Sequence, residues 1–576
     1  MKFMKDLGLR NCFRGAPGLA IYLLLALHGC GGSGGGGDGA GGAGGESLSG
    51  TEHLTAAEVQ TIIAQAATQA TASGLPVTIA VVDHEGVVLG VLRMAGGPVN
   101  TTIGGGGTGG LEGVSGGLVT AANAAISKAG TGAFFSTQRN AFTTRTASFI
   151  VQEHSPPQVD PSPGGPLFGV QFSNLRCSDV NRTDSAPPAP LGNKKLPLGL
   201  SADPGGLPLY KNGVAVGGIG VEGDGTYTLD RGQPDETPTL EETIAAAGTL
   251  GFSAPAAIRG NNIFVDGVRL TFANADPPAS QVTTPYATFA AQGTEVVVPI
   301  LSPATTFVAA TVNGVVGSID PNFFPFLAGT DGGLTAAEVS RIIGQAAVQA
   351  DVTRAAIRLP VGSPARVSIT VVDTTGTVLG IFRTLDAPLF GFDVSAQKAR
   401  TAAFFSNAAA SAELTAGGFG AYVTAAAADG LALNGSVAFS SRTVGFLSQP
   451  IYPPGAQAPF SNGPFSKALG AWSIFNTGLQ LDQIAGQLGN VGTGCSPAAL
   501  PRLRNGITIF PGGFALYKNG VLVGAIGISG DGVDQDDLVS FAGSAGFEAP
   551  PGIRADTVTV RGAALPYVVT PRHPNL

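Results

Sequence analysis

The chain has 576 residues, of which only 12% are charged and 87 are glycine, and its formal net charge is −8. This length is sufficient for two or three domains, each with a sizeable core. Nucleic-acid binding calls for a basic face, so the acidic balance argues against that class of partner. Beyond the N-terminus, no stretch reaches the roughly 18 uninterrupted apolar residues expected of a membrane-spanning helix.

The N-terminus has the pattern of an export signal, which does not belong to the fold. A basic segment precedes an apolar run over residues 16–27, and Leu27-His28-Gly29-Cys30 resembles the lipobox of bacterial lipoproteins. We therefore predict a signal peptide over residues 1–29 and lipidation at Cys30. The alternative is an ordinary cleaved signal, with Cys30 lost or free.

A Gly-rich stretch over residues 30–50 follows and predicts a flexible tether. Gly31 is not an aspartate, which in a diderm bacterium permits transport to the outer membrane. We expect an exported protein that is lipid-anchored in the cell envelope, at the outer membrane, and faces the periplasm or the exterior.

Outside the signal and the lipid site, the cysteines that remain are Cys177 and Cys495, each of which precedes the same repeated hairpin. In an oxidising compartment they could form a disulfide between the two halves, and two buried free thiols are the alternative. No Cys-x-x-Cys-His motif is present, which excludes covalent c-type haem.

The folded part begins with a helix that occurs twice. The residues Leu54–Val59 recur as Leu334–Val339, and Thr55 with Glu58 makes a capping box at the helix start. A hairpin follows each helix, over residues 77–93 and 367–383, and Asp83 is expected to accept backbone hydrogen bonds in its turn.

An Ala-rich helix is predicted next in each copy, over residues 121–135 and 396–405, with a lysine, a threonine and paired phenylalanines in common. The segments 141–157 and 438–454 then align. There the copies differ, because His154 of the first corresponds to Ile451 of the second.

The clearest repeat is a second hairpin, Leu209–Gly225 in the first copy and Leu516–Gly532 in the second, with Lys-Asn-Gly at the turn. Its second arm is apolar and rich in glycine, which lets another group approach the backbone closely. That group is either a helix packed over the glycines or a bound ligand. Closing helices over residues 240–252 and 535–547 begin with paired carboxylates, which we interpret as helix-dipole partners rather than a metal site.

This order of elements resembles the GlcG/HbpS-like family of haem-binding proteins. The matching residues are Ala80–Asp83, Lys128, Ala129, Thr131, Gly205, Gly206 and Gly217–Gly220, with their counterparts Thr370–Asp373, Lys398, Ala399, Thr401, Gly512, Gly513 and Gly524–Gly527. The resemblance implies an α/β (α+β) fold in which two tandem domains each consist of an antiparallel sheet flanked by helices.

We place the first domain at residues 51–273, a linker at 274–331, the second domain at 332–562 and a tail at 563–576. Part of the linker could instead pair as an additional strand. The resemblance further implies that the two copies form an internal pseudo-dimer and that the chain has a tendency to form homo-oligomers.

The resemblance also implies non-covalent binding of b-type haem, for which a histidine in an apolar pocket is the usual ligand. His154 is the first candidate for the haem iron, His84 the second and His53 the third. The helix residues Lys128, Phe134 and Phe135 complete the predicted cofactor-binding set. The second copy has no histidine, so we expect at most one well-ligated haem per chain.

We therefore predict an envelope lipoprotein that binds haem or a related tetrapyrrole for sequestration, delivery or sensing. The alternative is a non-catalytic assembly or interaction module with a degenerate pocket. No nucleophile elbow, zinc-ligand spacing or phosphate loop is found in a suitable context, so no catalytic residues are predicted and the chain is not expected to be an enzyme.

Overall fold

The computed structural model describes residues 52–104, 116–152, 165–175, 178–179, 196–230, 232, 235–297, 307–321, 324–454, 461–467, 478–488 and 500–570. The predicted signal peptide and tether, with Cys30, lie outside these residues. The same holds for His154, Cys177 and Cys495. The lipid site, the first haem ligand and the disulfide therefore stay predictions.

The first half of the described chain is organised around a five-stranded antiparallel sheet with the order β10-β2-β1-β6-β5. The strands are β1 (Thr78–Asp83), β2 (Val88–Arg93), β5 (Gly206–Lys211), β6 (Val214–Glu222) and β10 (Thr294–Val297). The turn between β5 and β6 has positive φ at Asn212 and Gly213, as its Asn-Gly sequence predicts.

The second half repeats this arrangement in a six-stranded sheet with the order β11-β12-β14-β13-β16-β15. Its strands are β11 (Val308–Val312), β12 (Val315–Ile319), β13 (Val367–Val372), β14 (Val378–Thr384), β15 (Gly513–Lys518) and β16 (Val521–Gly530). The predicted fold class is confirmed. Strands β10, β11 and β12 come from residues 274–331. Part of the predicted linker therefore pairs with the sheets as additional strands, as the alternative interpretation has it.

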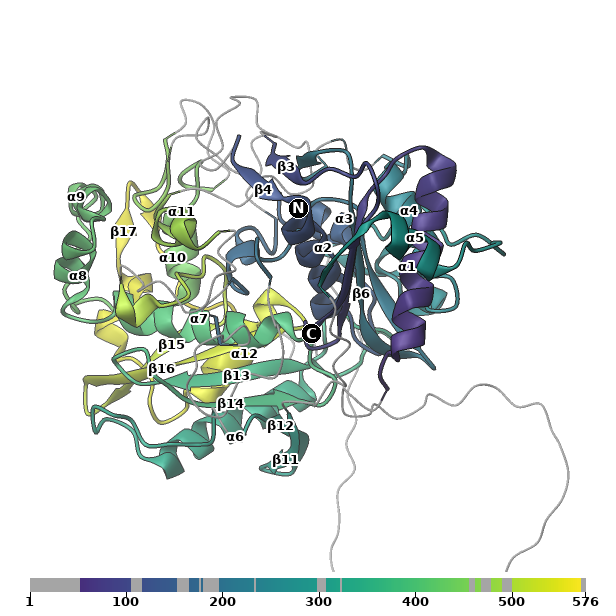
Figure 1. Cartoon of the computed structure of the whole chain (residues 1–576). Coiled ribbons are helices and arrows are strands. Elements are labelled where there is room, and N and C mark those ends of the chain that lie inside the picture. Colours follow the sequence, from purple (N-terminus) through teal and green to yellow (C-terminus); the bar gives the residue numbers. More distant parts are fainter. Residues whose placement is uncertain are drawn as a thin grey trace, which may run out of the picture. The chain divides into compact units, whose positions relative to one another are not determined.

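Helices cover both faces of each sheet (Figure 1). In the first half, α1 (Ala56–Ser73) and α4 (Leu240–Gly248) share one core with the sheet, and α2 (Ala121–Phe135) lies on the other face. In the second half the equivalent helices are α6 (Ala336–Val352), α12 (Val533–Gly543) and α7 (Phe390–Phe405). The capping boxes predicted for α1 and α6 are both present.

Shorter elements complete the described chain. The helices are α3 (Thr144–Ile150), α5 (Tyr286–Gln292), α8 (Ala410–Ala416), α9 (Gly420–Ala428), α10 (Ser441–Leu447) and α11 (Leu479–Ile484). The strands are β3 (Asn100–Ile103), β4 (Leu118–Thr120), β7 (Thr226–Tyr227), β8 (Phe264–Val265), β9 (Val268–Arg269), β17 (Thr559–Val560) and β18 (Ala563–Ala564). Within the described ranges, no helix combines the length and the apolar character that a membrane crossing requires.

The glycines of β6 and β16 lie directly under helices α2 and α7. A Cβ atom on Gly218 would lie 2.0 Å from the carbonyl oxygen of Ala129, and one on Gly220 would lie 2.1 Å from that of Ala125. In the second half, a Cβ on Gly527 would lie 2.0 Å from the carbonyl oxygen of Ser395. Of the two interpretations of the Gly-rich arm, helix packing is therefore the correct one.

The two halves belong to one compact unit, Glu46–Leu576, and share a continuous hydrophobic core. The rings of Phe135 in α2 and Phe390 in α7 meet edge to face, with centroids 4.8 Å apart. Buried polar contacts also join the halves, and the Arg400 guanidinium donates to Asp179 at 2.7 Å. These contacts pack the two copies against each other within one compact unit.

We predict that Gly220→Ala or Gly527→Ala lowers the free energy of unfolding by roughly 1–3 kcal/mol or more, because the new methyl group overlaps a helix carbonyl. Chemical denaturation measures the effect. The control is Gly552→Ala, where nothing lies within 4 Å of the new Cβ. An unchanged stability in the first two variants would contradict the close packing of helix on strand.

Candidate functional site

A cavity of about 370 Å³ lies where the two halves meet. Its walls are mostly apolar and come from both copies. The first half contributes Phe135, Phe142, Ile150, Pro166, Leu167, Phe264, Val265, Asp266 and Leu270, and the second contributes Arg354, Ala356, Ile357, Phe390, Val569 and the segment around the start of α12. The volume is at the lower end of the range for small-molecule sites, and the aromatic lining is typical of them.

The polar end of this cavity is built by the end of β16 and the first turn of α12, where Ser529, Gly530 and Asp536 line it. One carboxylate oxygen of Asp536, Oδ2, accepts a hydrogen bond from Lys398 Nζ at 2.7 Å. The other, Oδ1, is buried and has no hydrogen-bond partner. Burial raises the pKa of Asp536 to about 7, although Lys398 opposes the shift.

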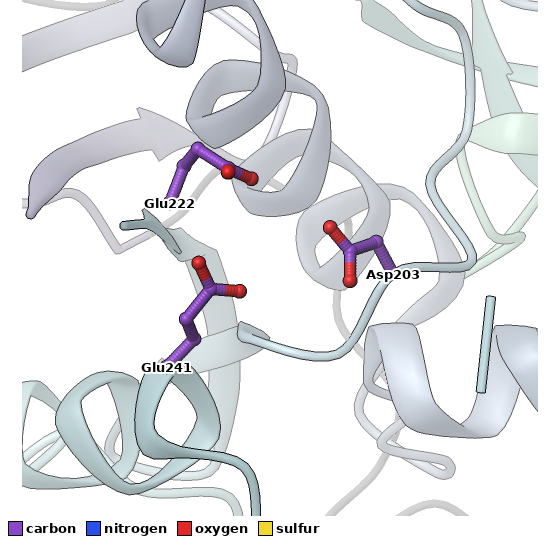
Figure 2. A group of neighbouring side chains, drawn as sticks. All are labelled: Asp203, Glu222 and Glu241. Carbon is purple, nitrogen blue, oxygen red and sulfur yellow. The ribbon is translucent and has the colours of Figure 1, made fainter. Parts of the chain in front are cut away.

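A second polar group lies in the first half, where the ammonium of Lys128 is surrounded by three buried carboxylates. Its Nζ lies 2.8 Å from Asp203, 3.0 Å from Glu222 and 2.6 Å from Glu241. Figure 2 shows the three acidic side chains pointing toward one another. Three carboxylate oxygens so close together could in principle hold a hard cation, but Lys128 already lies between them. We call these four residues the Lys128 cluster.

The equivalent lysine of the second half, Lys398, has a different environment. It pairs with Asp536 and lies 4.9 Å from the centroid of the Phe510 ring. In the repeat, Phe510 and Ser529 take the places of Asp203 and Glu222. One carboxylate is therefore enough to hold this buried lysine, and the first half carries two more.

Burial and the neighbouring charges together shift the pKa values of the Lys128 cluster. Burial disfavours a charged lysine, but the three acidic neighbours outweigh it and raise the pKa of Lys128 above its usual value. Burial also disfavours the charged form of Glu241, and for a carboxyl group this raises the pKa, to about 7 from 4.5. The folded chain thus holds a proton that the unfolded chain releases, so the free energy of unfolding falls as the pH rises from about 4.5 to 7.

The paired carboxylates at the starts of the closing helices are more than dipole partners. Glu241 belongs to the Lys128 cluster, and Glu242 accepts from the buried Arg145 at 2.8 Å. In the second half, Asp537 pairs with Arg442 in the same way. The sequence interpretation did not identify these ion pairs, because their partners lie about 95 to 140 positions away in the chain.

The structure does not bring all the predicted ligand-binding residues together. Phe135 lines the cavity, whereas the neighbouring Phe134 ring packs under the turn after β1, where a Cβ on Gly86 would lie 2.7 Å from it. His84 lies in that turn with 9% of its surface exposed, and its buried Nδ1 has no hydrogen-bond partner. Burial, helped by Arg383, lowers the pKa of His84 to about 4, so the imidazole is neutral at pH 7.

The remaining predicted residues occupy different environments. His53 is exposed, and its backbone carbonyl accepts from Lys211. Lys128 is fully buried in its cluster, and His154 lies outside the described residues. The predicted set missed Phe390 and Asp536, which the pairing of the two halves brings to the cavity. An alignment of the two repeats pairs Asp203 with Phe510 and Glu222 with Ser529, and this difference could have indicated that Lys128 and Lys398 have different surroundings.

Comparison with known proteins finds one matching family model. Residues 472–545, which contain β15, β16 and α12, match the model described as "Haem degrading protein HbpS-like". This segment of the second half is therefore HbpS-like. No curated protein sequence matches the chain.

Several solved structures are similar to parts of the chain, among them the following three. They are a PduOC:heme complex (18% identity, 38% of this chain and 96% of that chain, TM-score 0.19), Klebsiella pneumoniae protein ORFY (18%, 37% and 88%, 0.20) and a double mutant of Streptomyces reticuli HbpS (19%, 37% and 97%, 0.17). Each match covers somewhat more than a third of this chain.

We predict that Asp203→Asn raises the free energy of unfolding at pH 7.5 by about 1 kcal/mol or more, because burial and the neighbouring carboxyls Glu241 and Glu222 raise the pKa of Asp203, and the amide has no charged form to bury. At pH 5 the gain is smaller, since protonation of the Asp203 carboxyl then costs less. Urea denaturation at the two pH values measures both quantities. A loss of stability at both would show that the full set of charges is needed for folding.

Proposed function

We propose, from the premise that a segment of the second half is HbpS-like, that the chain binds haem or a related tetrapyrrole non-covalently in the cavity between its halves. The observation that carries this proposal is the cavity itself, which has aromatic walls from both copies and a small polar end. A macrocycle has large apolar faces, and burial of such faces against Phe135, Phe142 and Phe390 excludes water from both.

The described lining suits the apolar faces of a tetrapyrrole ring, but it lacks the side chains that most often bind haem iron. Among the described residues of the cavity there is no histidine, cysteine, methionine or tyrosine. Arg354 is exposed at the cavity and offers a guanidinium for a ligand carboxylate, such as a propionate. A haem would supply a redox-active iron and a visible chromophore, while these residues bind the ring, orient it and exclude water.

His154 remains the first candidate for an iron ligand. Ile150, four positions before His154 in the sequence, and Pro166, twelve positions after it, both line the cavity, which supports the choice. His84 is the second candidate, because its imidazole is neutral and its Nδ1 is unpartnered, but it is not among the lining residues. His53 is the third.

We further propose that binding serves sequestration, delivery or sensing at the cell envelope, where a lipid on Cys30 anchors the chain. A binding role needs no catalytic residues. The description of the matched family as haem-degrading makes turnover of the bound ring the second candidate function. Loss of the haem absorbance with time after binding would distinguish turnover from simple binding.

The test is a haemin titration of the chain with Cys30→Ser, followed by the Soret absorbance. We expect a saturable shift near one equivalent. Leu167→Trp should weaken binding at least tenfold, because the larger side chain fills the cavity. The matched control is Leu240→Trp, at a residue that is 52% exposed and does not line the cavity.

His154→Ala is measured in the same titration. A changed Soret band with His154→Ala supports His154 as the ligand, and an unchanged band moves the ligand to His84, His53 or a residue of another type. If the wild-type chain shows no saturable binding, an interaction module with a degenerate pocket is the better account.

A further inference from the structure

Residues 274–331 supply the outermost strand on one side of each sheet, β10 in the first half and β11 in the second. Figure 1 shows β11 at the periphery of the second sheet. An edge strand can pair with another chain, and proteins commonly prevent this with a charged side chain on the edge. Strand β10 carries Glu295, whereas β11 (Val308–Val312) has no charged residue. The edge of the second sheet therefore lacks this protection.

The turn between β11 and β12 decides which backbone groups of β11 are free. Its two residues, Asn313 and Gly314, both have positive φ, and the flanking residues Val312 and Val315 lie opposite each other. In such a two-residue turn the flanking pair exchanges both of its hydrogen bonds, and bonded and non-bonded pairs alternate from there along the strands. Every second residue of β11 therefore points its backbone N–H and C=O away from β12.

These outward groups belong to Ala309 and Thr311, whose side chains are also exposed. In the described part of the chain, no further strand pairs with this side of β11. The strand itself is held firmly, because the ring of Phe307 packs edge to face on Phe392, with centroids 5.3 Å apart, and Val312 is buried in the core. Free backbone groups thus lie along an edge whose position is fixed.

The side chains of β11 suit pairing with a second copy of the same strand. Its sequence, Val-Ala-Ala-Thr-Val, has small or β-branched residues throughout and valine at both ends. In an antiparallel pair with its two-fold axis at Ala310, Ala309 lies opposite the partner's Thr311, and Val308 lies opposite the partner's Val312. The backbone groups of Ala309 and Thr311 are the ones that face outward, so these residues exchange hydrogen bonds across the edge. The valine pairs bring β-branched side chains together, and no like charges meet.

We infer that β11 joins two copies of the chain into a two-fold symmetric dimer, in which the second sheets of both copies continue across the edge. Val308, of whose surface 45% is exposed, then gains a cross-strand neighbour. A contact in which the same strand serves both copies is closed, so it stops at the dimer. The inference is independent of the proposed ligand, and it assigns the expected tendency to form homo-oligomers to a named edge.

The test is sedimentation velocity of the full chain carrying Cys30→Ser, without ligand, over a series of protein concentrations. We expect a reversible dimer. Two like-charged double variants, Ala309→Lys with Thr311→Lys and Ala309→Glu with Thr311→Glu, place equal charges opposite each other in both cross-strand pairs. Each should weaken dimerisation about tenfold or more. Because both side chains are exposed, the added charges leave the fold intact.

The matched control is Ala309→Glu with Thr311→Lys, which changes the same positions but places opposite charges face to face. It should keep the dimerisation constant within about threefold of the wild-type value. Circular dichroism checks the fold of each variant. A monomeric wild-type chain overturns the inference, and so does a dimer that both like-charged variants leave unchanged. Equal weakening by all three double variants also overturns it, because the register around Ala310 is then wrong.

Discussion

The rest of the structure depends on the close approach of helices α2 and α7 to the glycines of β6 and β16. A side chain at these glycine positions would push the helix outward, because its Cβ atom would overlap a helix carbonyl. The close approach fixes where the functional side chains of each helix lie. It holds Lys128 and Lys398 over the ends of their strands, and it presents Phe135 and Phe390 to each other across the two halves.

This arrangement occurs twice in the chain, and the two copies differ around their buried lysines. The first copy surrounds Lys128 with three carboxylates, whereas the second surrounds Lys398 with Asp536, Phe510 and Ser529. In the second copy, Ser529 and Asp536 line the cavity. The second copy thus supplies the polar end of the cavity, and the first supplies much of its aromatic wall.

Local signals in the sequence were sufficient for most of the fold. The capping boxes at Thr55 and Thr335 and the Asn-Gly turns at Asn212 and Asn519 specify where helices begin and hairpins turn, and the repeat shows that each unit occurs twice. The predicted bounds of the closing helices were less accurate. The helix expected over residues 240–252 ends at Gly248, and the one expected from residue 535 begins at Val533.

The candidate site was harder to predict because it depends on contacts between distant residues. Phe135 could be proposed from its paired-phenylalanine motif, but its neighbour Phe134 faces a different turn. Nothing local to Phe390 or Asp536 indicates that the two halves meet there. The pairing of buried charges, such as Lys128 with Asp203, also links positions that no sequence period connects.

The central claim is that one ligand site is built from both halves, and hydrogen exchange of the full chain tests it most directly. The measurement compares the chain carrying Cys30→Ser without a ligand and the same chain saturated with haemin. We predict slower exchange in segments of both copies, around Phe142–Ile150 in the first and Ser529–Asp536 in the second. Protection confined to one copy, or to the turn that contains His84, would contradict this account.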